Sequence, residues 1–214
     1  MPTADEELSD AVLEATATFE SAANCFADLV DTIPISALDG PGLGEWDLRS
    51  LIGHTSRSLT TVTTYLAQPA ERVEVESTAV YYRFTVQFIG ADPAGVAERG
   101  RQAGIALGDD PAAAVRGLLN DAITAVRGVR GDPVITTIAG GMRFSDYLPT
   151  RVFELVVHTL DIAAALDREV SAPPQPLADA LQLAAELALR NGDGQALLLA
   201  LTGRKALPEG YSVL

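Results

Sequence analysis

The feature that most constrains the fold of this 214-residue chain is a helical spacing of apolar residues that recurs in four long stretches. Apolar side chains return every three or four residues in each stretch, which places them on one face of an α-helix. The stretches lie at about residues 8–33, 48–68, 111–129 and 147–167. Such helices bury their apolar faces best against one another, so the pattern predicts a mainly α protein built on a four-helix bundle.

Capping signals mark where several of these helices begin. The Thr-x-x-Glu pattern at residues 3–6 predicts a capping box before the first helix, and Asp47 is the expected N-cap of the second. Asp92–Pro93 and Asp110–Pro111 each combine an N-cap residue with proline at the first helical position. Ser145 or Asp146 is the expected cap of the last long helix.

Three further features of the sequence predict shorter elements and a proline position. Residues 134–139 and 142–144 flank a Gly140–Gly141 pair, which predicts a small β-hairpin with a Gly-Gly turn. Pro149 is expected in the first turn of the long helix, where proline is tolerated. Residues 81–89 fit a helix or a strand, and we favour a helix.

The C-terminal part is shorter and less regular. Residues 171–176 are rich in proline and indicate a linker, residues 177–190 predict a helix that ends at Asn191–Gly192, and residues 196–202 predict a short apolar helix. We therefore expect residues 1–170 to form the bundle. Residues 171–214 would be a short extension packed on it, not an independent domain.

The charge of the chain excludes some classes of function. The formal net charge is −14, whereas binding of nucleic-acid phosphates needs a basic surface, so no nucleic-acid partner is expected. No apolar run approaches the roughly 20 residues of a membrane span, and the acidic N-terminus does not resemble a signal peptide. Cys25 is the single cysteine, so no intrachain disulfide can form. A cytoplasmic location is the simplest expectation.

A candidate metal site lies on the last long helix. Glu154 and His158 are four residues apart and share one helical face, among Phe, Leu and Val side chains. Asp161 continues this face. His54, the only other histidine, lies in the second long helix. Two imidazoles and a carboxylate make the three-ligand set of a catalytic zinc site, which keeps one position open.

The spacing alone leaves other interpretations open. Glu-x-x-x-His pairs also occur on solvated helix surfaces, a lone core histidine is more often hydrogen-bonded than a ligand, and the His-Glu-x-x-His signature is absent. Asp161 would support a ligand or a bound water, or else be a surface aspartate. Arg151 would pair with Glu154 or with a cofactor carboxylate, although a solvated arginine is the simpler expectation.

Three stretches resemble the maleylpyruvate isomerase family of mycothiol-dependent enzymes, within the DinB-like superfamily of metal-binding four-helix bundles. They are Trp46–His54 (WDLRSLIGH), residues 147–163, and Ala196–Arg204 (ALLLALTGR). The resemblance implies zinc ligands at His54, Glu154 and His158, with water completing the site. It also implies a role for Arg204 in binding substrate or thiol.

The implied activity uses mycothiol, a low-molecular-weight thiol of actinobacteria, activated as a zinc thiolate that attacks a small electrophilic substrate. Addition, bond rotation and loss of the thiol would be a cis–trans isomerisation, whereas loss of another group would be S-transfer. The alternative is a non-catalytic metal- or ligand-binding bundle. The ligand set also accepts nickel, cobalt, manganese or iron. The expected assembly is a monomer or a homodimer.

Overall fold

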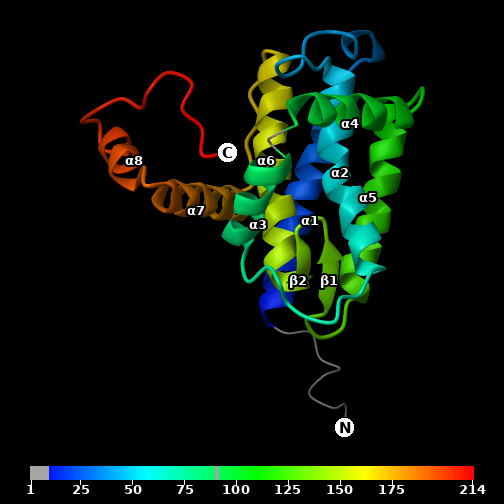
Figure 1. Ribbon diagram of the computed structural model, residues 1–214. Coiled ribbons are helices and arrows are strands. Elements are labelled where there is room, and N and C mark those ends of the chain that lie inside the picture. The colour runs from blue at the N-terminus through cyan, green and yellow to red at the C-terminus, as the bar shows by residue number, and fades with distance from the viewer. Residues whose placement is uncertain (1–9, 90–91) are drawn as a thin grey trace.

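Four long helices lie side by side and enclose the main core of the protein (Figure 1). They are α1 (Asp10–Asp31), α2 (Leu48–Leu66), α5 (Pro111–Gly128) and α6 (Phe144–Ala165). α1 packs against α5 and α6, and α2 packs against the same two helices. The computed structural model describes residues 10–89 and 92–214, so the capping box expected at residues 3–6 lies outside the described residues. The predicted mainly α bundle is confirmed.

Shorter elements connect and cover these helices. A short 3₁₀ turn, η1 (Ile35–Ala37), follows α1, and α3 (Thr78–Phe84) continues into a π-helical turn, η2 (Thr85–Ile89). α4 (Pro93–Ala106) crosses α2 on the outside of the bundle. The helix favoured for residues 81–89 is therefore confirmed. The side chains of Asp47, Asp92 and Asp110 each accept a hydrogen bond from a backbone N–H in the first turn of the helix that follows, as predicted.

Glycines bring α2 and α4 into backbone contact next to the candidate site. A Cβ atom on Gly53 would lie 2.1 Å from the Gly104 nitrogen, and one on Gly100 would lie 2.6 Å from the Trp46 ring. The Trp46 indole N–H donates a hydrogen bond to the Ala97 carbonyl oxygen at 2.9 Å. These contacts fix α4 across the N-terminal half of α2, the half that carries His54.

The hairpin consists of β1 (Val134–Thr137) and β2 (Gly140–Arg143), which pair antiparallel. The expected Gly-Gly turn is wrong by two residues, because Gly140 and Gly141 belong to β2 and the turn is Ile138–Ala139. The Thr137 hydroxyl holds this turn through the Gly140 carbonyl and the Ala139 N–H. Gly141 instead allows close approach of another segment, since a Cβ there would lie 2.1 Å from the Arg72 carbonyl oxygen.

The beginning of α6 also differs from the expectation. α6 starts at Phe144, so neither Ser145 nor Asp146 is its N-cap, and Pro149 lies in its second turn. Asp132, from the loop before the hairpin, accepts hydrogen bonds from the Ser145 N–H at 3.0 Å and the Ser145 hydroxyl at 2.8 Å. A distant aspartate thus satisfies the helix end that a local residue was predicted to cap.

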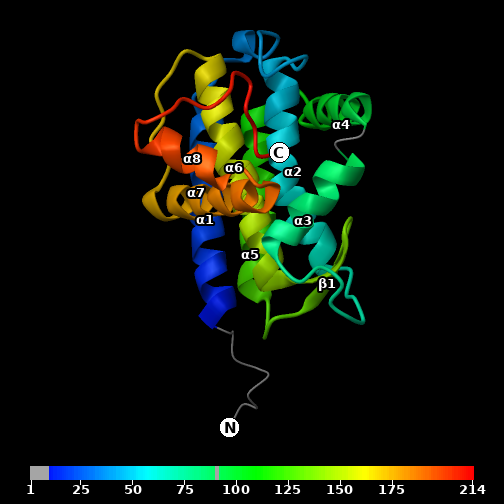
Figure 2. The same ribbon diagram turned by 60° about the vertical axis from the view of Figure 1, so that its left-hand side comes forward.

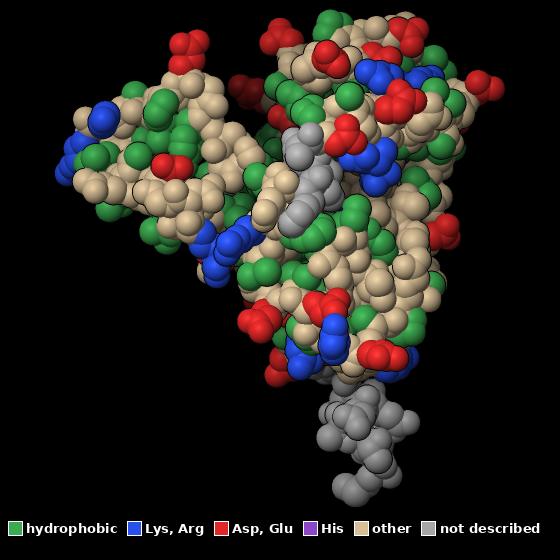
Figure 3. Space-filling model, viewed as in Figure 1, with side chains coloured by type: hydrophobic (Ala, Val, Ile, Leu, Met, Phe, Trp, Pro, Cys, Tyr) green, Lys and Arg blue, Asp and Glu red, His purple; other side chains and the backbone are tan. Residues whose placement is uncertain are grey.

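The C-terminal segment forms an arm at one side of the bundle (Figures 1 and 2). α7 (Pro174–Asn191) packs across α6 and touches α1 and α3, whereas α8 (Gly194–Leu201) packs mainly on α7. Gly192, with φ +89°, ends α7 as expected. No residue of α8 is fully buried, and hydrophobic side chains are visible over the arm in Figure 3. None of the helices in the described part of the chain is long and apolar enough to cross a membrane.

Candidate metal centre

The three residues that the sequence singled out as metal ligands meet between α2 and α6. His54 lies in the second turn of α2, and Glu154 and His158 lie one turn apart on α6. Each offers one ligand atom, and the three atoms lie within 4.8 Å of one another. Ligands of a single zinc ion lie about 2 Å from the metal, so only a small closure of the side chains would bring all three within binding distance.

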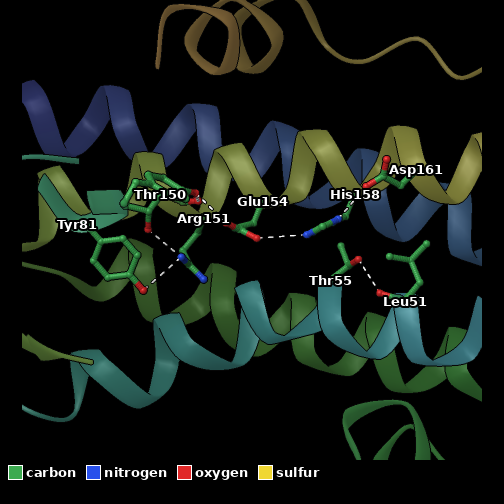
Figure 4. A network of polar contacts seen from close by, with 9 residues as sticks. Leu51, Thr55, Tyr81, Thr150, Arg151, Glu154, His158 and Asp161 are labelled. Atoms are coloured by element: carbon green, nitrogen blue, oxygen red, sulfur yellow. Dashed lines mark hydrogen bonds and ion pairs between the residues drawn. The ribbon is translucent and has the colours of Figure 1, made fainter. Parts of the chain in front are cut away.

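The α6 half of the site is an ordered chain of polar contacts (Figure 4). The His158 Nε2 atom lies 3.3 Å from the Glu154 Oε2 atom, and the His158 Nδ1 atom lies 2.9 Å from the Asp161 Oδ2 atom. The side chains of His158 and Glu154 are only 14% and 20% exposed. Asp161 therefore fixes the orientation of the His158 ring and directs its Nε2 atom toward Glu154, as carboxylates do behind metal-binding histidines.

The α2 half is much less polar. The His54 ring lies 4.5 Å from the Trp46 ring and 5.0 Å from the His158 ring, between centroids. Its Nδ1 atom is buried and has no hydrogen-bond partner among the described residues. Burial lowers the pKa of His54 to about 4, and the nearby His158 adds to this shift. His54 is therefore neutral at pH 7, the state in which an imidazole binds a metal.

The charges on α6 also suit a cation. Burial alone would raise the pKa of Glu154, but the hydrogen bond from His158 and the charge of Arg151 outweigh it and lower the pKa to about 2. Burial would likewise lower the pKa of His158, but hydrogen bonds to Asp161 and Glu154 raise it to about 9. At pH 7 His158 is therefore protonated, and the charge of Glu154 stabilises this proton. A metal bound between the two side chains would take its place. Together with the unpartnered His54 nitrogen, this donor set fits a divalent cation.

Comparison with models of known protein families identifies the family of this chain. A family model described as the mycothiol maleylpyruvate isomerase N-terminal domain matches residues 19–163. The chain belongs to this family. The matched range includes His54, Glu154, His158 and Asp161, and it ends before Arg204. No curated protein and no solved structure matches the chain. The family resemblance drawn from the sequence motifs is confirmed.

The buried Tyr82 on α3 also contacts the candidate metal site, and no sequence pattern had pointed to it. Its hydroxyl lies 2.8 Å from the Glu154 Oε1 atom and 3.0 Å from the Thr150 carbonyl oxygen. A phenol has one proton, and the carboxylate is the stronger acceptor, so Tyr82 holds the oxygen of Glu154 that does not face His158. A tyrosine on an inward helical face needs such a partner, but the sequence does not show which one it finds.

A cavity of about 310 Å³ adjoins the site. His54 and Glu154 lie in its wall, together with Arg57 from α2, Arg99 from α4 and Arg151 from α6. This volume lies at the lower end of the usual range for small-molecule sites. A substrate in the cavity would therefore touch the candidate metal site and several arginines at once.

The two arginines discussed from the sequence are placed differently from expectation. Arg151 is 9% exposed, so the expected solvated arginine is wrong, and it forms no ion pair with Glu154. Arg204 is exposed just beyond α8, where its side chain donates a hydrogen bond to the Thr202 carbonyl oxygen. The structure brings Arg151 to the cavity wall but does not bring Arg204 there.

Proposed function

We propose that this protein is a metal-dependent enzyme that uses a low-molecular-weight thiol, mycothiol. The thiol would either isomerise a small electrophile or become attached to it through its sulfur atom (S-transfer). The observation that carries the proposal is the meeting of His54, Glu154 and His158 beside a cavity. Membership of the mycothiol maleylpyruvate isomerase family supports the choice of thiol. Zinc is the first candidate metal, because two imidazoles and one carboxylate are typical zinc ligands.

His54, Glu154 and His158 would hold the cation. When bound, a divalent cation favours the thiolate form of a thiol and so supplies the nucleophile. Asp161 would keep the His158 ring oriented, and Tyr82 would hold the Glu154 carboxylate. The Trp46 ring packs against the His54 ring and would help to hold it in place.

The chain's residues would then position the electrophile next to the thiol. For isomerisation, the thiolate would form a carbon–sulfur bond to a carbon–carbon double bond, whose π electron pair moves onto a conjugated carbonyl group of the electrophile. The remaining single bond rotates, and the electron pair then re-forms the double bond as the carbon–sulfur bond breaks and releases the thiolate. For S-transfer, the carbon–sulfur bond stays and another group leaves with the electron pair of its bond. Both reactions need the cavity to hold the electrophile in place, which the side chains of α2, α4 and α6 would do.

Metal content measured by mass spectrometry tests the proposal on protein purified without a metal-affinity tag. We expect about one equivalent of metal per chain, bound by the three-ligand set. Consumption of mycothiol in the presence of small electrophiles is the second measurement. Protein without metal, even after zinc is offered, would contradict the proposal.

The alternative is a non-catalytic metal- or ligand-binding bundle, and one observation favours it. Arg204, which the resemblance assigned to substrate or thiol binding, lies on the arm and not in the cavity wall. Bound metal combined with no thiol chemistry on any electrophile would support this alternative.

We also propose that residues 171–214 are an extension of the bundle and not an independent domain. α7 buries Ala180, Leu183 and Leu187 in the same core cluster as the bundle helices, whereas α8 has no buried residue of its own. Removing residues 193–214 should therefore leave a folded bundle, whereas removing α7 as well should destabilise it.

A further inference from the structure

Within the part of the chain that the structure describes, Arg151 is a buried cation that has no carboxylate in direct contact, although the charge of Glu154, one turn along α6, acts on it through space. Its Nε atom donates to the Thr150 hydroxyl at 2.9 Å, and one Nη atom lies 3.5 Å from the Tyr81 hydroxyl. The guanidinium also lies over the rings of Tyr81 and Tyr147, 5.6 and 5.3 Å from their centroids. It forms no ion pair with any carboxylate of the described residues. Part of its hydrogen-bonding capacity is therefore unused at the cavity wall.

Other arginines of the chain form direct ion pairs, whereas Arg151 forms none with a described residue. The chain has 29 acidic and 15 basic residues, so carboxylates are plentiful. Several surface arginines are paired: Arg72 with Glu74, Arg116 with Asp28 and Asp31, Arg127 with Glu20, and Arg190 with Glu186. The guanidinium of Arg151, by contrast, touches no carboxylate of the residues described and keeps donors free, so it can pair directly with an anion from outside the chain.

Two further arginines face the same cavity. Arg57 lies one turn after His54 on α2, and its side chain forms no hydrogen bond or ion pair with a described residue. Arg99 of α4 makes only a long contact with Asp92, at 3.9 Å, and both residues line the cavity. Three guanidinium groups from three helices thus border one small space. Guanidinium groups match the oxygens of carboxylates and phosphates and bind them in pairs of hydrogen bonds.

We propose that Arg151, together with Arg57 and Arg99, forms a binding site for an oxyanion, a carboxylate or phosphate group carried by the small electrophile. This inference rests on the proposed function in one respect only, namely that the molecule bearing the anionic group is the electrophile. Arg151 is the fixed part of the site, because Thr150 and the two tyrosine rings hold its guanidinium. Arg57 and Arg99 would close on the anion from the opposite helices.

The spacing along α6 limits the size of the electrophile. Arg151 lies one helical turn before Glu154 and two turns before His158, which corresponds to rises of roughly 5 and 10 Å. An oxyanion bound at Arg151 would therefore be separated by only a few bonds from a carbon next to the candidate metal site. A compact electrophile with its charged group near the reactive carbon fits this arrangement.

Calorimetric titration of the full chain tests the proposal. The probes are succinate and inorganic phosphate, with uncharged succinamide as the control ligand, all at one ionic strength set with sodium chloride. The protein is titrated as purified and again after chelator treatment and dialysis. We expect binding of one or both anions, no binding of succinamide, and retention of the binding without metal. The stronger of the two anions identifies the group that the electrophile carries.

Three variants then locate the anion. Arg57→Gln and Arg151→Gln should each weaken anion binding by roughly tenfold or more, the loss expected for a charge-assisted hydrogen-bonded pair. Arg83→Gln is the matched control, because Arg83 lies just after Tyr82, is exposed, and lines a different cavity. If Arg151→Gln does not fold, as judged by circular dichroism and melting temperature, Arg57→Gln decides the question alone.

The outcomes separate this proposal from the proposed function. The oxyanion site is overturned if the wild-type protein binds neither anion, if Arg57→Gln binds as tightly as wild type, or if chelator treatment alone abolishes binding. Metal content is measured in the same preparations. Anion binding by a protein that takes up no metal, even after zinc is offered, would contradict the enzyme proposal and leave the oxyanion site intact.

Discussion

His54 on α2 and His158 on α6 face each other across the candidate site, but their surroundings differ in almost every respect. The His158 ring has a carboxylate at each nitrogen, and its pKa is raised to about 9. His54 lies against the Trp46 ring, its Nδ1 atom has no partner among the described residues, and its pKa is lowered to about 4. α6 therefore orients its ligand before any cation arrives, whereas α2 supplies a neutral ligand held by packing.

The largest expected effect is the loss of metal when either histidine is removed. His158→Ala and His54→Ala should each lower zinc affinity by more than roughly 100-fold, because a three-ligand site would keep only two protein ligands. Metal content by mass spectrometry and helical content by circular dichroism are the measurements. A His158→Ala protein that still binds one equivalent of metal would disprove the ligand assignment.

Asp161→Asn should have the next largest effect and should act only on the α6 half of the site. The change removes the carboxylate at the His158 Nδ1 atom, and such supporting partners are typically worth 10- to 100-fold in metal affinity. Competition with a chromophoric chelator measures the affinity. Asp121→Asn, on the exposed surface of α5, is the control and should change nothing.

Several features of the site and of the fold could be predicted from the sequence, because they depend on residues that are close together in the chain. The spacing of Glu154, His158 and Asp161 places all three on one face of a helix. Asp47, Asp92 and Asp110 cap helices through their own nearby backbone, so their roles follow from three or four consecutive residues. The position of His54 opposite this face was predicted only by assuming that two amphipathic helices pack together.

The features that were not predicted depend on residues distant in the sequence. Asp132 caps α6 across the intervening hairpin, and Tyr82 reaches Glu154 from α3. Arg151 was expected to be solvated, but it is buried, and its guanidinium lies over the rings of Tyr81 on α3 and Tyr147 on α6. Such tertiary contacts leave no local pattern, since a tyrosine or arginine at a helical position is compatible with many partners.

Metal binding should also depend on pH, and at mildly acidic pH the dependence should come from His158 alone. Below pH 9 the metal-free His158 carries a proton that must leave before a metal can bind, whereas His54 is already neutral above about pH 4. Zinc affinity should therefore rise about tenfold per pH unit between about pH 5 and pH 6.5, with release of about one proton per metal. At higher pH a zinc-bound water, with a pKa of about 7, adds a proton of its own. Calorimetry in buffers of different ionisation enthalpy counts the protons.

The same titration of Asp161→Asn sharpens this result. Losing the carboxylate removes a cause of the raised pKa of His158, so the variant should release fewer protons per metal than the wild-type protein at pH 8. Release of two protons by the wild-type protein at about pH 6, where a zinc-bound water still keeps its proton, would mean that His54 is also charged. The contrast between the two histidines would then be wrong.

The smallest effect is expected for Tyr82→Phe, which leaves both histidines unchanged and removes one hydrogen bond to Glu154. The loss should be about 1 kcal/mol, or roughly three- to tenfold in zinc affinity, because the carboxylate keeps its contact with His158. Tyr65→Phe is the matched control, since Tyr65 lies in the wall of the same cavity and its hydroxyl makes no hydrogen bond with a described residue. Equal effects of the two changes would show that Tyr82 acts only by packing. A larger effect for Tyr82→Phe would show that α3 holds the Glu154 carboxylate. Residues of two helices, α3 and α6, would then orient the ligands on α6, while His54 depends on packing alone.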